Sequence, residues 1–370
     1  MNSRRDNPQC RAAQFKLAGQ GEIPRCHENG SPPPKEEGVG VVAQRSTTPH
    51  PSLSKEGNHV AIFMPSGEPK DHAIFTRNDT PRPWLVRLAD YWTLTKPEVN
   101  FLVLVGTLVG FYLAARGPVD FRLLLHTLLG TLLVASGTGT LNQYIERQSD
   151  KHMRRTANRP LPAGRLAPGE ALGWGILLAA LGGAQLWVFA NPLTSLLALL
   201  TLAAYLLLYT PLKKRTPLCT LVGAFPGAMP PLIGWAAVRN SVSLGAGVLY
   251  LILFLWQFPH LLAIAWMYRE DYARAGLQML PRNDRDGRAT VRQILGYLLV
   301  LLPVSLAPAF LGQVGKAYLV GALVLGFGFL HYGMRLALHR SNSFARRLVL
   351  ASIVYLPLVF ALMMADKTHG

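Results

Sequence analysis

Nine long apolar runs constrain the fold of this 370-residue chain more than any other feature of its sequence. Each run has roughly 17 to 22 residues, the length that a helix needs to cross the hydrocarbon core of a bilayer, and none has Lys, Arg or Asp at its centre. Half of all residues are apolar and the mean hydropathy is +0.23, as in proteins that reside in lipid. The sequence therefore predicts an all-α, polytopic membrane bundle of about nine transmembrane helices. The runs cover residues 98–115, 122–141, 171–190, 193–210, 218–238, 247–268, 293–311, 317–334 and 348–364.

The first 90 residues have a different composition. Stretches such as "SPPPKEEG" and "RSTTPHPSLSKEG" are rich in Pro, Ser, Lys and Glu and have no apolar periodicity. Such a segment cannot bury enough apolar surface to offset the entropy lost on ordering. We therefore expect a disordered cytoplasmic tail over residues 1–90 and a membrane domain over 91–370. The tail lacks the apolar core of a secretory signal. Its basic start, "MNSRRDNPQCRAAQFK", is compatible with a transit peptide, which stays an alternative interpretation.

Neither nucleic-acid binding nor cysteine-based metal binding is expected. The net charge of +17 would suggest a nucleic-acid partner for a soluble domain, but basic loops also orient membrane helices. The chain has three cysteines, Cys10, Cys26 and Cys219, and their spacing suits neither zinc nor an iron–sulfur cluster.

The basic residues are unevenly divided between the two sides of the predicted membrane domain. If the chain crosses the bilayer at each run, the loops on one side hold 19 lysines and arginines, and the other side holds only five. Because cytoplasmic loops carry the excess of Lys and Arg, this side is expected to be cytoplasmic. The basic loops are 142–170, 211–217, 269–292 and 335–347.

Three oxygen-bearing side chains follow the second apolar run at intervals of four residues: Asn142, Glu146 and Asp150. On a helix this spacing places them in a line along one face. Magnesium prefers one or two carboxylates together with water and phosphate oxygens, which such a line could supply. The alternative is a helix end whose charges are solvated among lipid headgroups. Acidic groups contribute little to orientation, however, so the whole arrangement favours a metal and anion site.

Basic residues and a second acidic pair are expected on the same side. Arginines suited to a diphosphate follow the acidic line closely, and Glu270 and Asp271 follow the sixth run, an even number of spans later. The sequence predicts that these groups surround one metal-bound diphosphate. The expected metal ligands are Asn142, Glu146, Asp150, Glu270 and Asp271, and the expected basic groups are Arg154, Arg155, Arg159, Lys213, Lys214 and Arg215.

Three stretches carry a resemblance to a known family: "NQYIERQSDKHMRRTANRPLPAGR", "YTPLKKRTPLCTLVGAFPGAMPPLIGW" and "WQFPHLLAIAWMYREDYARAGLQMLP". They resemble the intramembrane (UbiA-type) prenyltransferase superfamily over about residues 94–364, and "MRRTANRPLP" resembles its haem-modifying branch. The resemblance implies transfer of the farnesyl group of farnesyl diphosphate to a vinyl group of haem b. Water addition would then give haem O, for the biosynthesis of haem O and haem A in terminal oxidases.

The resemblance also implies roles for particular residues and partners. Asn142, Glu146, Asp150 and Asp271 would be catalytic, and Mg²⁺ would be the cofactor. Tyr268 and His260 would join the basic groups in binding the substrates. The implied partners are farnesyl diphosphate, haem b and the lipid bilayer, with haem A synthase or oxidase assembly proteins as further candidates. We expect a bacterial inner membrane, with the mitochondrial inner membrane as the alternative, and an active site facing the cytoplasm or matrix.

Histidines within the apolar runs leave alternatives open. His260 follows Pro259 and could contact haem iron or a propionate, or could bond a neighbouring helix near a proline kink. His126 and His331 are similar candidates with less support from a motif.

Two other functions are considered. One is prenylation of an aromatic acid such as 4-hydroxybenzoate by another member of the superfamily. The other is transport, because "GAFPGAMPPLIGW" resembles an unwound transporter helix. The charged clusters are predicted at one membrane face rather than at the midplane, and this counts against transport.

Overall fold

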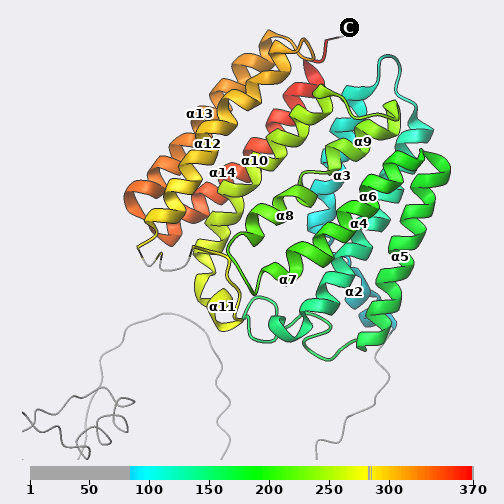
Figure 1. The fold of residues 1–370 in the computed structure, drawn as a ribbon, viewed down its shortest axis with the longest axis vertical. Coiled ribbons are helices and arrows are strands. Elements are labelled where there is room, and N and C mark those ends of the chain that lie inside the picture. The colour runs from blue at the N-terminus through cyan, green and yellow to red at the C-terminus, as the bar shows by residue number, and fades with distance from the viewer. Residues whose placement is uncertain (1–83, 282–283, 285, 369–370) are drawn as a thin grey trace, which may run out of the picture. The chain divides into compact units, whose positions relative to one another are not determined.

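The computed structural model describes residues 84–281, 284 and 286–368, and within them nine helical spans are long and apolar enough to cross a membrane (Figure 1). This confirms the predicted all-α bundle. Most of the predicted tail lies outside the described residues, and helix α2 begins at Trp84, ahead of the predicted boundary at residue 91. The described helices are α2 (Trp84–Leu94), α3 (Pro97–Ala114), α4 (Phe121–Asp150), α5 (Pro168–Phe189), α6 (Pro192–Ala203), the π-helix η1 (Ala204–Tyr209), α7 (Thr210–Leu212), α8 (Cys219–Gly227), α9 (Pro230–Arg239), α10 (Leu244–Met267), α11 (Arg269–Arg274), α12 (Arg288–Phe310), α13 (Lys316–His339) and α14 (Asn342–Ala365).

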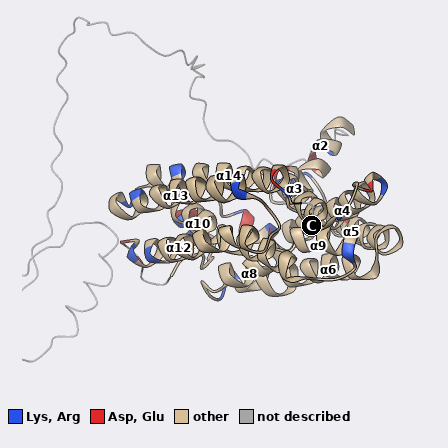
Figure 2. Ribbon diagram, turned by 90° about the horizontal axis from the view of Figure 1, so that it is seen from above, with Lys and Arg blue, Asp and Glu red and all other residues tan. Residues whose placement is uncertain are grey.

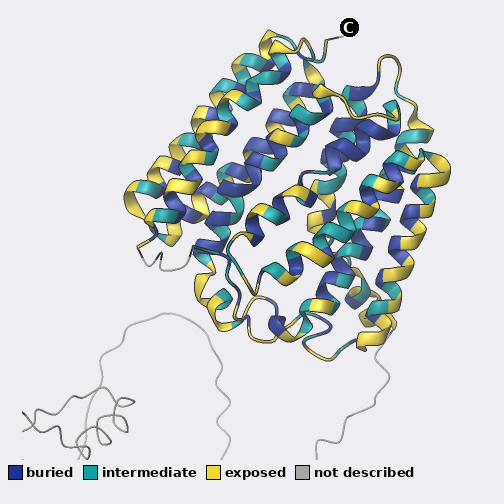
Figure 3. Ribbon diagram, in the orientation of Figure 1, coloured by how far each residue is buried: buried dark blue, intermediate teal, exposed yellow. Residues whose placement is uncertain are grey.

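The long helices pack in two neighbouring groups. In one group, α12 contacts α10 and α13, and α14 also contacts α10 and α13. In the other group, α3 packs on α9, and α4 packs on α5 (Figure 1). Figure 3 shows that α9 and α10 are largely buried, whereas the outer faces of α5, α12 and α13 are exposed. The exposed outer side chains include Trp187, Phe310 and Phe327. Apolar groups on an outer surface suit a protein whose solvent there is lipid.

Glycines allow two helix pairs to approach at backbone distance. A Cβ atom at Gly234 of α9 would lie 1.9 Å from the carbonyl oxygen of Thr107 in α3, and one at Gly110 would lie 2.0 Å from the carbonyl oxygen of Pro231. Between α4 and α5, a Cβ at Gly137 would lie 2.7 Å from the carbonyl oxygen of Gly175. Small residues at such crossings are typical of membrane helices, which associate mainly through close packing.

Two predicted spans are not regular helices. The predicted run 218–238 is divided into α8 and α9 near Ala228, and the predicted run 193–210 passes from α6 into the π-helix η1. Pro226 and Pro230 flank the first break, where their missing N–H groups interrupt the helical hydrogen bonds. The side-chain amide of Gln257 donates to the carbonyl oxygen of Ala224 (3.2 Å). Irregular backbone at membrane depth is tolerated where it lines a cavity, and both segments do so.

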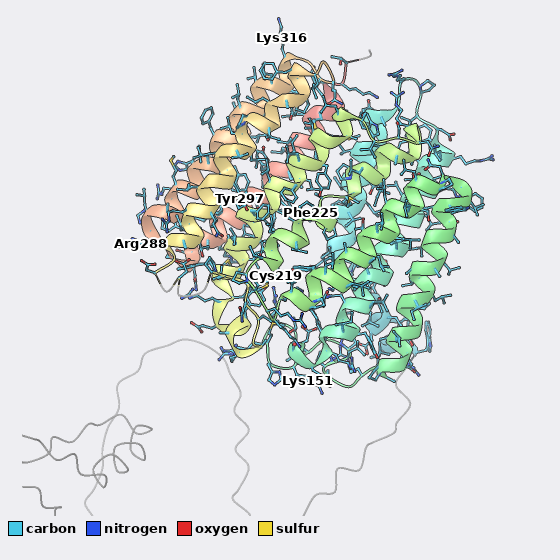
Figure 4. The ribbon with its side chains drawn as sticks, viewed as in Figure 1. Lys151, Cys219, Phe225, Arg288, Tyr297 and Lys316 are labelled. Carbon is cyan, nitrogen blue, oxygen red and sulfur yellow. The ribbon has the colours of Figure 1, made fainter. Side chains whose placement is uncertain are left out.

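Lys, Arg, Asp and Glu are sparse in the described bundle (Figure 2), and each of its spans contains an 18-residue apolar window with at most two of these residues. Lys151, directly after α4, and Lys316, at the start of α13, lie at opposite ends of the bundle (Figure 4). Helices α7 and α11 lie at the same end as the loop that follows α4 (Figure 1). The predicted acidic and basic segments are therefore assembled at one end.

Candidate functional site

The acidic line lies on the last turns of one continuous helix. Helix α4 is 30 residues long and extends beyond the predicted span as far as Asp150, so Asn142, Glu146 and Asp150 share its inner face. Asn142 and Asp150 are each 1% exposed, and the Glu146 side chain is 12% exposed. These side chains are not solvated among headgroups, which argues against the solvated helix end considered from the sequence.

Each member of the line contacts a cation from a different segment. The ammonium of Lys96 donates to Asn142 Oδ1 (2.6 Å), and that of Lys213 donates to Glu146 Oε1 (2.8 Å). Nη1 of Arg159 donates to Asp150 Oδ2 (2.9 Å). Buried carboxylates require such partners, because removing a charge from water costs several kcal/mol. Three oxygen groups and three cations thus form one polar cluster at the end of α4.

Lys96 is a site residue that the sequence reasoning missed. It precedes Pro97 at the start of α3 and has a left-handed backbone with φ of 54°. Burial lowers the pKa of Lys96 to about 7, and the charges of Arg159 and Lys213 act in the same direction. The only signal in the sequence was a lysine before a proline at the start of the first span. A half-buried lysine in this setting is suited to binding an anion.

Lys213 is positioned by the end of the fourth span. Its ammonium lies 4.5 Å from the centre of the Tyr209 ring, which η1 places beside Tyr205. Burial disfavours the charged form of Lys213, but Tyr209 and Glu146 outweigh burial and raise its pKa above the usual value. Thr210 accepts a hydrogen bond from Asn142 Nδ2 (3.3 Å) and links this segment to α4. π-helical turns are frequent at functional sites.

An apolar cavity of about 370 Å³ adjoins the polar cluster. Lys96, Tyr205 and Tyr209 line it near the cluster, and Gln257 supplies a polar group where α8 breaks. Most of the remaining lining is apolar, including Val99, Leu102, Val103, Val134, Ala198, Pro226, Ile233, Leu253, Trp256 and Leu356. A cavity that joins an apolar interior to a charged end suits an amphipathic ligand.

The polar cluster also has an oxygen available for a metal ion. Asp150 Oδ1 is buried and has no hydrogen-bond partner. With Asn142 and Glu146 it offers the hard oxygen donors that Mg²⁺ prefers. Nowhere in residues 84–281, 284 and 286–368 do three His, Cys, Asp or Glu side chains converge to form a metal cage. The donors therefore fit an open site in which water and phosphate oxygens complete the coordination.

The second acidic pair does not join this cluster. Glu270 is exposed, and Asp271 pairs with Arg274 within α11. The expectation that both bind the same metal as Glu146 and Asp150 stays a prediction. Instead, Arg155 connects the loop that follows α4 to helix α11.

Arg155 reaches α11 through two aromatic side chains. Its Nη2 donates to the hydroxyl of Tyr272 (2.9 Å), and its guanidinium carbon lies 4.9 Å from the centre of the Tyr268 ring. Three other predicted basic groups are exposed, and their side chains have no partner among the described residues: Arg154, Lys214 and Arg215.

His260 belongs to a helix–helix contact. Its Nδ1 shares a 2.7 Å hydrogen bond with the hydroxyl of Ser352 in α14, and its ring stacks on Trp256 at 4.9 Å. This geometry supports the structural alternative over a role as a haem ligand. His126 similarly bonds Gln185 (2.6 Å), and His331 lies beside Tyr332 on the exposed side of α13.

Sequence comparisons identify related proteins over most of the membrane domain. Residues 103–360 match the family described as the UbiA prenyltransferase family. A protein of Solibacter usitatus (strain Ellin6076), named protoheme IX farnesyltransferase, is 50% identical over 289 residues. That match covers 76% of this chain and 99% of the relative.

Solved structures share the fold at low sequence identity. A digeranylgeranylglyceryl phosphate synthase superposes with a TM-score of 0.64 and 17% identity, covering 76% of this chain and 98% of the other. A UbiA homologue from Archaeoglobus fulgidus, bound to GPP and Mg²⁺, has a TM-score of 0.52 and 16% identity. The latter match covers 74% of this chain and 99% of the homologue. Both confirm the helical fold.

Proposed function

Because the chain belongs to the UbiA prenyltransferase family, we infer that it transfers the farnesyl group of farnesyl diphosphate to a vinyl group of haem b. It is an integral membrane enzyme, and its products are haem O and diphosphate. The observation that carries this function is the junction at Lys96, where the buried polar cluster of α4 meets the apolar cavity. Farnesyl diphosphate has the same two parts, an apolar chain and a charged head.

We propose that the cavity holds the farnesyl chain and the polar cluster holds the diphosphate. Lys96, Arg159 and Lys213 are the cations nearest the acidic line, and each now bonds an oxygen of this chain. Diphosphate oxygens can replace those partners, because charge-assisted hydrogen bonds to phosphate are of the same kind. Arg155, held at α11, would contact the head from the other side.

Asn142, Glu146 and Asp150 would hold Mg²⁺ beside the diphosphate. A magnesium ion bound there would neutralise the negative charge that develops on the leaving diphosphate. The Archaeoglobus fulgidus homologue shares this fold and binds GPP together with Mg²⁺, which supports this assignment.

The reaction requires ionisation, carbon–carbon bond formation and capture by water. When the C1–O bond of farnesyl diphosphate breaks, Lys96, Arg159 and Lys213 stabilise the departing anion. The rings of Tyr205 and Tyr209 line the cavity at this end, where their faces can stabilise positive charge on C1. A haem vinyl carbon then bonds to C1, and water adds to the other vinyl carbon with loss of a proton. The apolar lining of the cavity keeps other water from the allylic cation.

We propose that the active site faces the cytoplasm, because the loops at that end of the bundle carry the excess of Lys and Arg. A bacterial inner membrane is the proposed location. Haem b would reach the polar end from that side or from the bilayer.

A comparison of acceptors tests the function. Purified protein is given farnesyl diphosphate and Mg²⁺ with either haem b or 4-hydroxybenzoate, and the products are separated by chromatography. We expect a farnesylated, hydrated haem from the first mixture and no prenylated product from the second. Prenylated 4-hydroxybenzoate without a haem product would assign the chain to the aromatic-acid branch. If folded protein forms neither product, the proposed reaction is contradicted.

A further inference from the structure

A second apolar groove lies between α13 and α14, away from the cavity described above. Its volume is about 520 Å³, and its floor includes Phe329 and Tyr355, whose ring centres are 5.0 Å apart. Val324, Leu350 and Val354 line it and are more than half exposed. Because α13 and α14 are membrane spans, the groove opens toward lipid.

Arginines occupy one end of this groove. Arg347 lines it directly, near the start of α14. Arg335, near the end of α13, lies 5.3 Å from the centre of the Phe344 ring, and Arg347 lies 5.1 Å from the same ring. The ring of His339 also stacks on Phe344. One aromatic ring thus holds two guanidinium groups at the mouth of the groove.

Neither of these arginines has an acidic partner among the described residues. Helices α13 and α14 contain no Asp or Glu, and neither Arg335 nor Arg347 pairs with a carboxylate of the described residues. Figure 4 shows Lys316, the first residue of α13, at the opposite end of the bundle from Lys151. The mouth of the groove is therefore at the basic end, at the level expected for headgroups.

We propose that this α13–α14 groove binds an anionic phospholipid, with an acyl chain along the groove and the phosphate at Arg335 and Arg347. Guanidinium groups bind phosphate oxygens in a planar fork, and basic sites between helix ends are suited to anionic headgroups. A zwitterionic lipid would fill the groove equally well but would leave the positive charge partly uncompensated. The structure therefore predicts that the groove prefers lipids with anionic headgroups to lipids with zwitterionic headgroups.

The experiment measures lipid binding to the purified full-length protein in neutral detergent. Dioleoyl phosphatidylglycerol and dioleoyl phosphatidylcholine are titrated separately, and bound lipids are counted by native mass spectrometry. The wild-type protein should prefer phosphatidylglycerol. In Arg335→Gln/Arg347→Gln this preference should fall roughly tenfold to a hundredfold, the range for loss of charge-assisted hydrogen bonds. Arg116→Gln/Arg122→Gln removes equal charge at the other end of the bundle and should keep the preference.

A second variant tests the groove without altering its charges. A Cβ at Gly328 would meet nothing within 4 Å, so Gly328→Leu projects into the groove and should weaken phosphatidylglycerol binding. Gly296→Leu on α12, where a Cβ also has open space, is the matched control. Inorganic phosphate should not displace the lipid. The proposal is overturned if the double arginine variant keeps its preference, if Gly328→Leu binds normally, or if free phosphate competes effectively.

Discussion

At the scale of single residues, the polar cluster is a set of exchangeable charge-assisted hydrogen bonds, two of which are ion pairs. Asn142, Glu146 and Asp150 bind cations from this chain, and Asp150 Oδ1 still has no partner. A substrate that brings both a metal ion and a diphosphate can satisfy both halves of the cluster at once. Binding of Mg²⁺ and binding of diphosphate should therefore be mutually dependent.

Replacement of Lys96 tests this account at the residue that the sequence did not indicate. Lys96→Met removes the charge but keeps most of the side-chain length, and we expect kcat/KM for farnesyl diphosphate to fall roughly tenfold to a hundredfold. Haem affinity, measured by absorbance titration, should change little. Lys151→Met, an exposed lysine just after α4, is the control. Equal losses in both variants would mean that Lys96 has no specific role.

The residue scale also shows what the sequence could predict. The four-residue spacing of Asn142, Glu146 and Asp150 defines a helix face without knowledge of the fold, and the structure confirms that helix. Their cation partners are distant in sequence: Lys96 is 46 residues from Asn142, and Lys213 is 67 from Glu146. No local pattern ties such residues together. Only packing of α3 and the fourth span against α4 brings them into contact.

At the scale of elements, packing at backbone distance connects the helices that surround the cavity. The α3–α9 contact depends on Gly110 and Gly234, and α3 begins directly after Lys96. Hydropathy predicted all nine spans, but it could not predict the break between α8 and α9, because both halves are apolar. Pro226 and Pro230 were the local signs of that break.

Gly234→Ala is expected to destabilise the protein despite the higher helix propensity of alanine. The added methyl group would lie 1.9 Å from the carbonyl oxygen of Thr107, so α3 and α9 must separate. Overpacking of this kind typically costs about 1–3 kcal/mol, or more where backbone is the obstacle. Thermal unfolding in detergent should show a lower Tm than for wild type. Gly247→Ala on α10 meets nothing within 4 Å and should not lower the Tm, and equal stability of both variants would contradict the packing account.

At the scale of the whole molecule, the fold gathers the predicted acidic and basic segments at one end. The loop after α4, the end of the fourth span and α11 are joined there by pairs such as Lys213–Glu146 and Arg155–Tyr272. The asymmetry of Lys and Arg in the sequence predicts that this end faces the cytoplasm.

Cysteine accessibility tests that orientation. In a variant with Cys10, Cys26 and Cys219 replaced by Ala, single cysteines at Ala163 and Ser343 should react with a membrane-impermeant thiol reagent only from the cytoplasmic side. Cysteines at Gly117 and Ser241 should react only from the opposite side. All four positions are exposed, three of them in loops and Ser343 in the first turn of α14. If positions 163 and 343 are labelled from different sides, the basic loops 142–170 and 335–347 cannot lie on the same side of the membrane.

The most direct test of the central claim is the binding of farnesyl diphosphate to the cluster at the end of α4. Radiolabelled farnesyl diphosphate is titrated onto purified full-length protein with and without Mg²⁺, in the absence of haem. Wild-type binding should depend on Mg²⁺. Glu146→Gln/Asp150→Asn should lose that dependence and bind roughly a hundredfold more weakly in its presence. Glu170→Gln, which removes an exposed carboxylate paired with Arg87, should behave like wild type. If the double variant binds as tightly as wild type, with the same response to Mg²⁺, the α4 cluster does not hold the diphosphate.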